Sequence, residues 1–443
     1  MDTPILDFVR SYADSRTRRF HMPGHKGREL LGCERFDITE VCGADVLYEA
    51  DGIIARSEAN ATALFGSQRT VYSTEGSSQC IRAMLYLALT NRRAGAAPVI
   101  VAARNVHKAF VYAAALLDLE VVWLWPEESA SLCGCPVSAE QLEQTLTALD
   151  APPAAVYLTS PDYLGGMADI PAMAEVCHRH GTLLLVDNAH GAYLRFLQPS
   201  AHPLDLGADL CCDSAHKTLP VLTGGAYLHI AETAPEEFAH HAKSAMALFG
   251  STSPSYLTLA SLDGCNEVLS GGYPQRLAEC AAQIVMAKEE LERAGWQVWP
   301  GDPLRLTLRA PEGMTGAELA QRLRDNGMEC EYADDQFLVL MLTPENDGAE
   351  LAQVVAVLGE NHAPYSQFEA LPQARGEQAV SIREALFAPH ELIPAEEAEG
   401  RICGAPTVSC PPAIPIAVSG ERIGAEAVEL LRRYGVTQVD ILK

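Results

Sequence analysis

The sequence lacks any excess of basic residues. Its 443 residues include 32 Lys and Arg against 58 Asp and Glu, so the formal net charge at pH 7 is −26. Nucleic acids and anionic membrane surfaces are recognised through a basic footprint, and we therefore expect neither as a partner. The acidity would attract a cationic substrate, but it is also a general means of keeping a protein soluble.

Long apolar stretches are also missing. No run approaches the ~18 apolar residues of a membrane-spanning helix. The first 20 residues carry charges throughout and contain no apolar core of a secretory signal. The 13 cysteines are scattered, many in apolar stretches, which favours reduced, mostly buried thiols. These features predict a cytoplasmic protein.

Metal-ligand spacing is absent as well. Cys133 and Cys135 form one short pair in a loop-like stretch, and no second pair follows at zinc-binding distance. His21 and His25 are four residues apart, but the Pro-Gly pair between them prevents the helical geometry that would direct both rings at one ion. We expect no metal site.

What the sequence does contain is a regular alternation of short apolar strands with helices, beginning near residue 57. The predicted strands are 70–73, 98–103, 120–125, 154–160, 182–187, 208–213 and 224–230. Short apolar strands alternating with helices predict an α/β fold with a mostly parallel central sheet covered on both faces.

The length of the chain exceeds what one small core needs, so we expect more than one domain. Residues 1–56 are rich in Gly, Pro and Asp and are interpreted as an N-terminal arm. Residues 57–295 would form the large α/β domain. Residues 296–443 mix short strands and helices and would form a smaller α+β C-terminal domain.

Polar groups follow five of the seven predicted strands. They are Thr74–Ser78, Asn105–Lys108, Thr159–Tyr163, Asp187–His190 and Ser214–Lys217. In parallel sheets, ligands bind beyond the carboxyl ends of the strands, so these groups are candidates for one shared site.

Two of these groups also have an ordinary explanation. Gly76, Ser77 and Ser78 open a helix, where backbone N–H groups and hydroxyls suit a phosphate. Ser77 could equally be a simple helix cap. His107 could stack on an aromatic ring, or could only cap the helix that follows it.

Asp187 and Lys217 are ambiguous in the same way. An acid that ends a buried strand could keep a heterocyclic nitrogen protonated, or could form a local turn with its own backbone. A lysine after an inner strand could form a Schiff base with an aldehyde cofactor, or could be an ordinary solvated cation. The combination is more specific: a Gly-Ser turn, then an acid, then a lysine 30 residues after that acid.

In this order the groups resemble those of fold-type-I pyridoxal 5'-phosphate (PLP) enzymes. More closely, the chain resembles the Orn/Lys/Arg decarboxylase family, which has a major domain and a C-terminal domain. The motifs that carry the resemblance are HMPGHKG (21–27), FDITEV (36–41), RNVHKA (104–109), VDNAHGA (186–192), DSAHKTLP (213–220), STSPSY (251–256) and SIREALFAP (381–389).

The resemblance implies a set of residues around the PLP ring. Lys217 would form the Schiff base with the cofactor, and Asp187 would pair with the pyridinium nitrogen. His107 would stack on one face of the ring, and His190 would lie near the ring and its substituents. Lys217, His107 and Asp187 are therefore the expected catalytic residues.

The resemblance also implies a phosphate site and an assembly. The phosphate would be bound by Gly76, Ser77, Ser78, Ser214 and His216. Ser251 and Thr252 would reach the phosphate of a neighbouring subunit, which implies a homodimer or a larger homo-oligomer.

The implied reaction is PLP-dependent decarboxylation of an amino acid, a basic one such as lysine, arginine or ornithine, in polyamine biosynthesis. The C-terminal motif departs from the family form, which reads like AE…PYPPGIP where this chain has CGAPTVSCPPAIPIAVSG (403–420). Ala405, Cys410 and Ala413 stand where an acid, a tyrosine and a glycine are typical.

Loss of that acid near the substrate weakens the case for a basic substrate, unless Glu40 or Asp45 of the arm replaces it. Two alternatives therefore stand beside the decarboxylase. One is another fold-type-I PLP enzyme, an aminotransferase or lyase with an altered pocket. The other is a catalytically silent family member.

Overall fold

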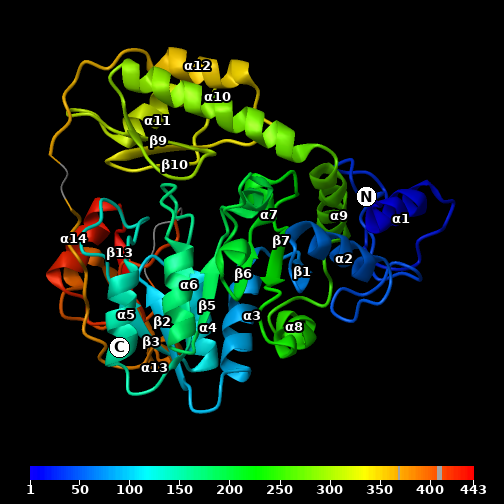
Figure 1. The fold of residues 1–443 in the computed structure, drawn as a ribbon, viewed down its shortest axis with the longest axis horizontal. Helices are drawn as coiled ribbons and strands as arrows, with labels where there is room; N and C mark the ends of the chain where they lie inside the picture. Colours follow the sequence, from blue (N-terminus) through cyan, green and yellow to red (C-terminus); the bar gives the residue numbers. More distant parts are fainter. Residues whose placement is uncertain (368–369, 407–411) are drawn as a thin grey trace. The chain divides into compact units, whose positions relative to one another are not determined.

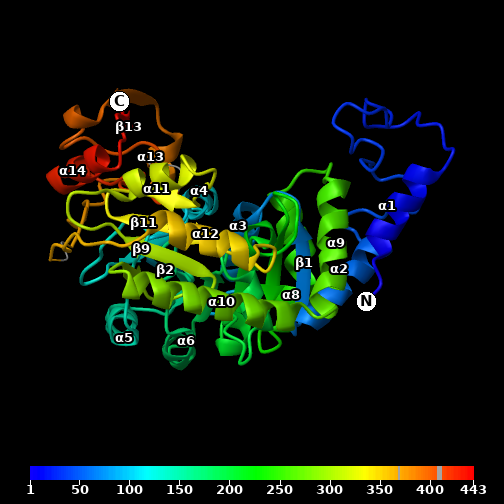
Figure 2. The same cartoon turned by 90° about the horizontal axis from the view of Figure 1, so that it is seen from above.

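The computed structural model describes residues 1–443 except 368–369 and 407–411, so Cys410 lies outside the described residues. The chain forms two compact units (Figures 1 and 2). The first unit comprises Met1–Ala94 and Leu183–Leu277, and the second comprises Gly95–Thr182 and Ala278–Lys443. No helix among the described residues is long and apolar enough to cross a membrane.

The main sheet has seven strands in the order β1-β7-β6-β5-β4-β2-β3. Its strands are β1 (Arg69–Ser73), β2 (Ala97–Ala103), β3 (Glu120–Leu124), β4 (Pro153–Thr159), β5 (Leu183–Asp187), β6 (Leu210–Asp213) and β7 (Ala226–Ile230). The pairs β2–β3, β2–β4 and β5–β6 are parallel, whereas β7 runs antiparallel to both β6 and β1. The predicted α/β fold with a mostly parallel sheet is confirmed.

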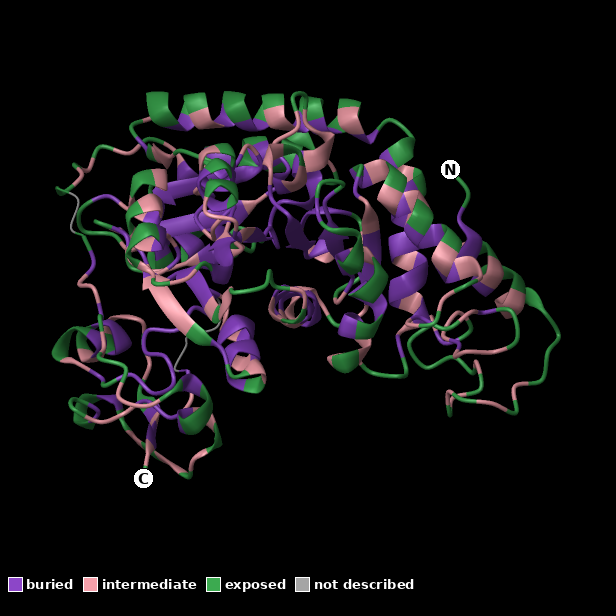
Figure 3. Ribbon diagram, turned by 60° about the horizontal axis from the view of Figure 1, so that its bottom comes forward, coloured by how far each residue is buried: buried purple, intermediate pink, exposed green. Residues whose placement is uncertain are grey.

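In the first unit, β5, β6 and β7 are buried almost throughout, as Figure 3 shows for most strands of the sheet. Strands buried on both faces read as continuous apolar runs, which is why the sequence predicted them at nearly these positions. The helices of this unit are α1 (Pro4–Asp14), α2 (Ile53–Phe65), α3 (Ser77–Thr90), α7 (Ala215–Thr218), α8 (Glu236–Leu248) and α9 (Tyr256–Ser270).

The N-terminal arm contains a helix that the sequence analysis did not anticipate. Helix α1 begins where the N–H groups of Ile5 and Leu6 donate to Asp263 of α9, at 2.8 and 2.9 Å. Ile5 and Val9 are buried. Residues 15–52 contain no helix or strand. The domain boundaries at 56 and 295 stay a prediction.

The second unit combines part of the main sheet with smaller antiparallel sheets. Its helices are α4 (Lys108–Leu117), α5 (Ala139–Ala148), α6 (Ile170–Arg179), most of α10 (Tyr273–Arg293), α11 (Gly316–Arg324), α12 (Gly348–Leu358), α13 (Ile382–Phe387) and α14 (Ala425–Arg433). Ser138 caps α5 in a complete capping box, as its position before the helix predicted.

The antiparallel strands of this unit are β8 (Gln297–Trp299), β9 (Arg305–Arg309), β10 (Tyr332–Ala333), β11 (Phe337–Met341), β12 (His390–Pro394) and β13 (Gln438–Leu442). The first four form one sheet in the order β10-β11-β9-β8, and the last two form a separate pair. Helix α11 packs on β11 and on α12. This is the predicted α+β pattern.

A buried arginine ties the RNVHKA motif to the C-terminal segment within the second unit. The Arg104 guanidinium donates to the carbonyl oxygen of Pro415 at 2.9 Å and to the Glu421 carboxylate at 3.1 Å. The same group lies over the rings of Trp123 and Trp125, each about 5.1 Å from the ring centroid. The segment that departs from the family form is therefore anchored next to the start of α4.

Ala413 in this segment has a left-handed backbone, with φ of 62°, and its carbonyl accepts the N–H of Lys108 at 3.0 Å. A left-handed conformation costs an alanine about 1–2 kcal/mol, whereas glycine adopts it freely. Ala413, which stands where the family form has glycine, therefore has a backbone conformation that glycine would adopt more freely.

We expect Ala413→Gly to stabilise the protein by about 0.5 kcal/mol, because relief of strain exceeds the greater chain entropy of glycine. Chemical denaturation monitored by circular dichroism would measure this change. The control is Ala417→Gly. Buried Ala417 is not among the residues with positive φ, so the loss of its methyl group should destabilise the fold. A destabilised Ala413→Gly would contradict the expectation.

Candidate functional site

The turn between β1 and α3 has the features of an anion site. Gly76 is the N-cap of α3, has a φ of 72° and makes no side-chain cap. A Cβ atom added to Gly76 would meet nothing within 4 Å, so open space lies beside the turn. The first N–H groups of a helix have no partner inside it, and they favour an anion. The interpretation of Ser77 as the helix cap is wrong.

Ser214 connects this turn to the end of β6. Its hydroxyl, buried at the start of α7, donates to the hydroxyl of Ser77 at 2.8 Å. Two hydroxyls that are 137 residues apart in the chain thus meet at the N-terminus of α3. Ser78 is the next residue of the same helix.

His216 follows in α7 and is half-buried. Its Nδ1 lies 3.0 Å from the carbonyl oxygen of Gly225, which can only accept, so Nδ1 carries the proton. Burial lowers the pKa of His216 below its usual value. An anion bound at Nε2 would favour the protonated ring and so would raise this pKa.

Lys217 is half-buried, and its Nζ lies 2.7 Å from Nε2 of His190. His190 comes from the turn after β5 and is 5 % exposed. The ordinary alternative, a freely solvated lysine, does not describe this side chain. The contact brings two candidate residues, 27 positions apart, into direct hydrogen-bonding distance.

Asp187 ends β5 and is 2 % exposed. Its Oδ1 accepts the N–H of Ala189 at 3.2 Å and faces the Cys212 thiol at 3.7 Å. The local turn that the sequence offered as an alternative is therefore present. It engages one carboxylate oxygen and is compatible with a functional role for the other.

The remaining candidates are Ser251 and Thr252 in the first unit and His107 in the second. Ser251 and Thr252 are exposed, and the N–H of Ser251 donates to Glu75 of the same chain, next to the Gly76 turn. His107 belongs to the second unit, where its Nδ1 accepts the N–H of Ala109 at 3.1 Å and caps α4. The capping interpretation of His107 is confirmed, and its stacking role stays a prediction.

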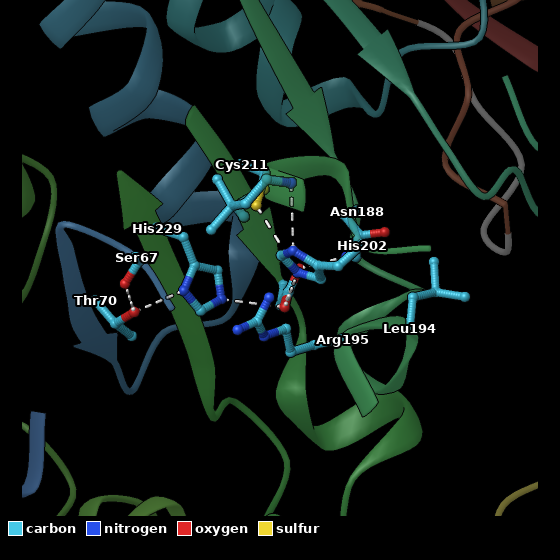
Figure 4. A network of polar contacts seen from close by, with 12 residues as sticks. Ser67, Thr70, Asn188, Leu194, Arg195, His202, Cys211 and His229 are labelled. Atoms are coloured by element: carbon cyan, nitrogen blue, oxygen red, sulfur yellow. Dashed lines mark hydrogen bonds and ion pairs between the residues drawn. The ribbon is translucent and has the colours of Figure 1, made fainter. Parts of the chain in front are cut away.

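The sequence analysis missed a buried polar network behind these residues (Figure 4). Asp213, the last residue of β6, accepts hydrogen bonds from Asn188 at 2.7 Å and from His202 and His229 at 3.1 Å each. All four residues are fully buried. The available signal was a charged residue and a histidine inside two adjacent apolar strands, ADLCCD and GGAYLHI.

Three of the buried groups, His202, Cys211 and Asp213, lie close enough to hold a metal ion, within 4.8 Å of one another. The hydrogen bonds favour a different interpretation. Nδ1 of His202 accepts the N–H of Leu204, so the proton of a neutral ring is on Nε2, which faces Asp213. A metal at Nε2 would have to displace this proton and with it the hydrogen bond to Asp213. The cluster is built for hydrogen bonding.

This network should affect how the stability of the fold changes with pH in the acid range. Burial alone would raise the pKa of Asp213, but His202 and His229 outweigh it and hold the pKa well below the usual value. A lowered pKa stabilises the fold above the unfolded value near 3.8, and the stability is lost as pH falls below it. We expect Asp213→Asn to cost about 2 kcal/mol at neutral pH, with the difference from wild type narrowing below about pH 4.

Urea unfolding at several pH values would measure the difference, and Asp263→Asn is the matched control. Burial raises the pKa of Asp263, so its stabilising effect should instead grow as pH falls from neutral. If the stability of Asp213→Asn and Asp263→Asn changed with pH in the same way, this would contradict the opposite pKa shifts of Asp213 and Asp263.

Two family models and several related proteins match most of this chain. The family model "Orn/Lys/Arg decarboxylase, major domain" matches residues 3–310, and the corresponding C-terminal domain matches residues 362–436. The chain is 29 % identical to the uncharacterized protein YaaO of Bacillus subtilis, over 98 % of this chain and 94 % of that protein. It is 27 % identical to an arginine decarboxylase of the same organism, over 97 % and 93 % of the two chains.

A lysine decarboxylase from Francisella novicida has a similar structure, with a TM-score of 0.81 and 16 % identity, over all of this chain and 81 % of that one. At this identity the likeness concerns the fold. The two family matches together cover most of the sequence, including all seven motifs noted above. The chain belongs to the Orn/Lys/Arg decarboxylase family.

Proposed function

We propose that this protein decarboxylates a basic amino acid with PLP, which Lys217 holds covalently. The observation that carries the proposal is the 2.7 Å contact between Lys217 Nζ and His190 Nε2. A lysine reacts with an aldehyde only as the neutral amine, and a histidine nitrogen at this distance can take up its proton. Asp187, buried at the end of the neighbouring strand, supplies the acid for the ring nitrogen.

The residues of the first unit fit the phosphate of this cofactor. The N-terminus of α3 opens onto free space beside Gly76, and the hydroxyls of Ser77 and Ser214 meet there. Ser78 and His216 would complete the phosphate site. Thr218 Oγ1, next to Lys217, is buried without a partner among the described residues, which is a common feature of polar atoms beside a ligand.

When bound, PLP supplies an electron sink for the pair of electrons left at Cα after CO2 departs. The chain's own residues would orient the ring and would return a proton to Cα. The Asp187 carboxylate would hold a proton on the ring nitrogen, and the phosphate site would fix the ring's position. Lys217, with His190 as its proton partner, would return a proton to Cα. His107 would stack on the ring, a role carried by the RNVHKA motif.

The proposal includes an assembly and a compartment. The side chains of Ser251 and Thr252 are exposed and would reach the phosphate of a neighbouring subunit, giving a homodimer or larger homo-oligomer. The 12 described cysteines are free thiols, as suits a cytoplasmic enzyme.

The substrate is the part of the proposal with a competing candidate. Family relatives are named arginine decarboxylases and lysine decarboxylases, which favours a basic amino acid and a place in polyamine biosynthesis. Ala405 and Cys410, where an acid and a tyrosine are typical, favour an altered pocket. A fold-type-I aminotransferase or lyase is therefore the second candidate.

The purified protein should show a cofactor absorbance band at the edge of the visible range, and Lys217→Ala should abolish it, because no other amine would take its place. Borohydride reduction followed by mass spectrometry should find the cofactor on Lys217. The control is Lys288→Ala, since Lys288 is also half-buried, in α10, where burial lowers its pKa. Wild-type protein without a band in added PLP would exclude the cofactor.

A substrate panel decides between the two candidate reactions. We expect CO2 release from lysine, arginine or ornithine, with turnover lost in Lys217→Ala. Amino-group transfer or elimination without CO2 release, in protein that carries the cofactor band, would favour the second candidate. A band with no reaction on any amino acid would favour a catalytically silent member.

A further inference from the structure

The Asp213 carboxylate is a single acidic group held by three donors in the interior of the first unit. It accepts the Asn188 amide on Oδ1, and the rings of His202 and His229 both approach Oδ2 (Figure 4). With the low pKa described above, Asp213 is ionised at neutral pH. Burying such a charge is costly unless its hydrogen bonds are satisfied.

The two histidines are themselves fixed from behind. His229 Nδ1 lies 2.8 Å from the hydroxyl of Thr70, which in turn contacts Ser67 at 2.8 Å. His202 opens a short 3-10 helix and accepts the Leu204 N–H there. The carboxylate of Asp213 is therefore held in one orientation from β1 and β7, leaving Oδ1 to face Asn188.

The Asp213–Asn188 bond joins the two loops that carry the proposed catalytic groups. Asn188 directly follows Asp187 and comes two residues before His190. Asp213 directly precedes Ser214 and comes four residues before Lys217. A backbone bond from Asn188 N–H to the carbonyl of Cys212, at 3.0 Å, joins the same loops.

The side chain of Asn188 is also confined on its other side. A Cβ atom added at Gly191 would lie 2.0 Å from Asn188 Oδ1, so only glycine leaves room for this amide. Asn188 thus packs between Asp213 and the Gly191 turn. A small shift of its amide would move the chain that carries His190.

We propose that Asp213 and Asn188 are positioning residues that set the His190–Lys217 contact and the place of Asp187. The inference rests on the proposed function. Apolar side chains could hold two strands together at lower cost than a buried charge. The carboxylate is at the junction of the two loops, where an oriented acceptor fixes a side chain more narrowly than apolar packing does.

The test compares Asp213→Asn, Asn188→Ala and the double variant with the wild type. Each single variant should weaken PLP binding about tenfold or more, because each disturbs the same hydrogen bond. Asn188→Ala removes its donor, and Asp213→Asn leaves one acceptor oxygen that cannot serve Asn188 and both histidines at once. Each should also shift the pH at which the absorbance band of Lys217-bound cofactor titrates. Since both residues act through one bond, the double variant should be no worse than the more severe single variant.

Asp263→Asn is the matched control, because Asp263 is also fully buried and accepts three donors, Ile5 N–H, Leu6 N–H and the Ser57 hydroxyl. It should lower the melting temperature while leaving the PLP dissociation constant and the titration of the band unchanged. A residue that only stabilised the fold would behave like this control.

Each outcome is decisive. Folded Asp213→Asn and Asn188→Ala proteins with wild-type affinity and band titration would overturn the inference, as would effects that add in the double variant. If Asp213→Asn does not fold, Asn188→Ala alone still decides, since it leaves Asp213 its two histidines. Wild-type protein that binds no PLP would instead remove the proposed function on which the inference rests.

Discussion

The parallel pairing of β5 with β6 is the constraint from which the candidate site follows. Leu185 pairs with Leu210 and Asp187 pairs with Cys212, so both strands end at the same edge of the sheet. Whatever follows them in the sequence must then meet in space. This register brings the Asp187–His190 turn against the Ser214–Lys217 turn. A shift by one residue would invert the side chains and separate the groups.

The two sides of this edge are stabilised by different means. On the open side, the contacts join hydroxyls, an amine and an imidazole, all of which can exchange partners with a ligand. On the buried side, Asp213 is enclosed by the side chains of Asn188, His202 and His229. A site that binds and releases a charged ligand needs a fixed support, and the hydrogen bonds around Asp213 would supply it under the proposed function.

The sequence predicted the strands, the α/β class and the order of the candidate groups, because buried strands read as apolar runs and strand ends as polar clusters. It did not predict helix α1, whose first turn depends on Asp263, some 250 residues away. It also left open whether Ser77 caps α3, whereas Gly76 holds that position with a positive φ. Spacing along the chain does not reveal such backbone angles or distant partners.

The sequence by itself determined the family and the residue types available for chemistry, since motifs such as VDNAHGA and DSAHKTLP are local and keep their order. Only the tertiary structure decided which of those residues touch. The contact of Lys217 with His190, the meeting of Ser77 with Ser214, and the enclosure of Asp213 by Asn188, His202 and His229 each join distant segments. Strand pairing creates these contacts, and pairing is a property of the whole sheet.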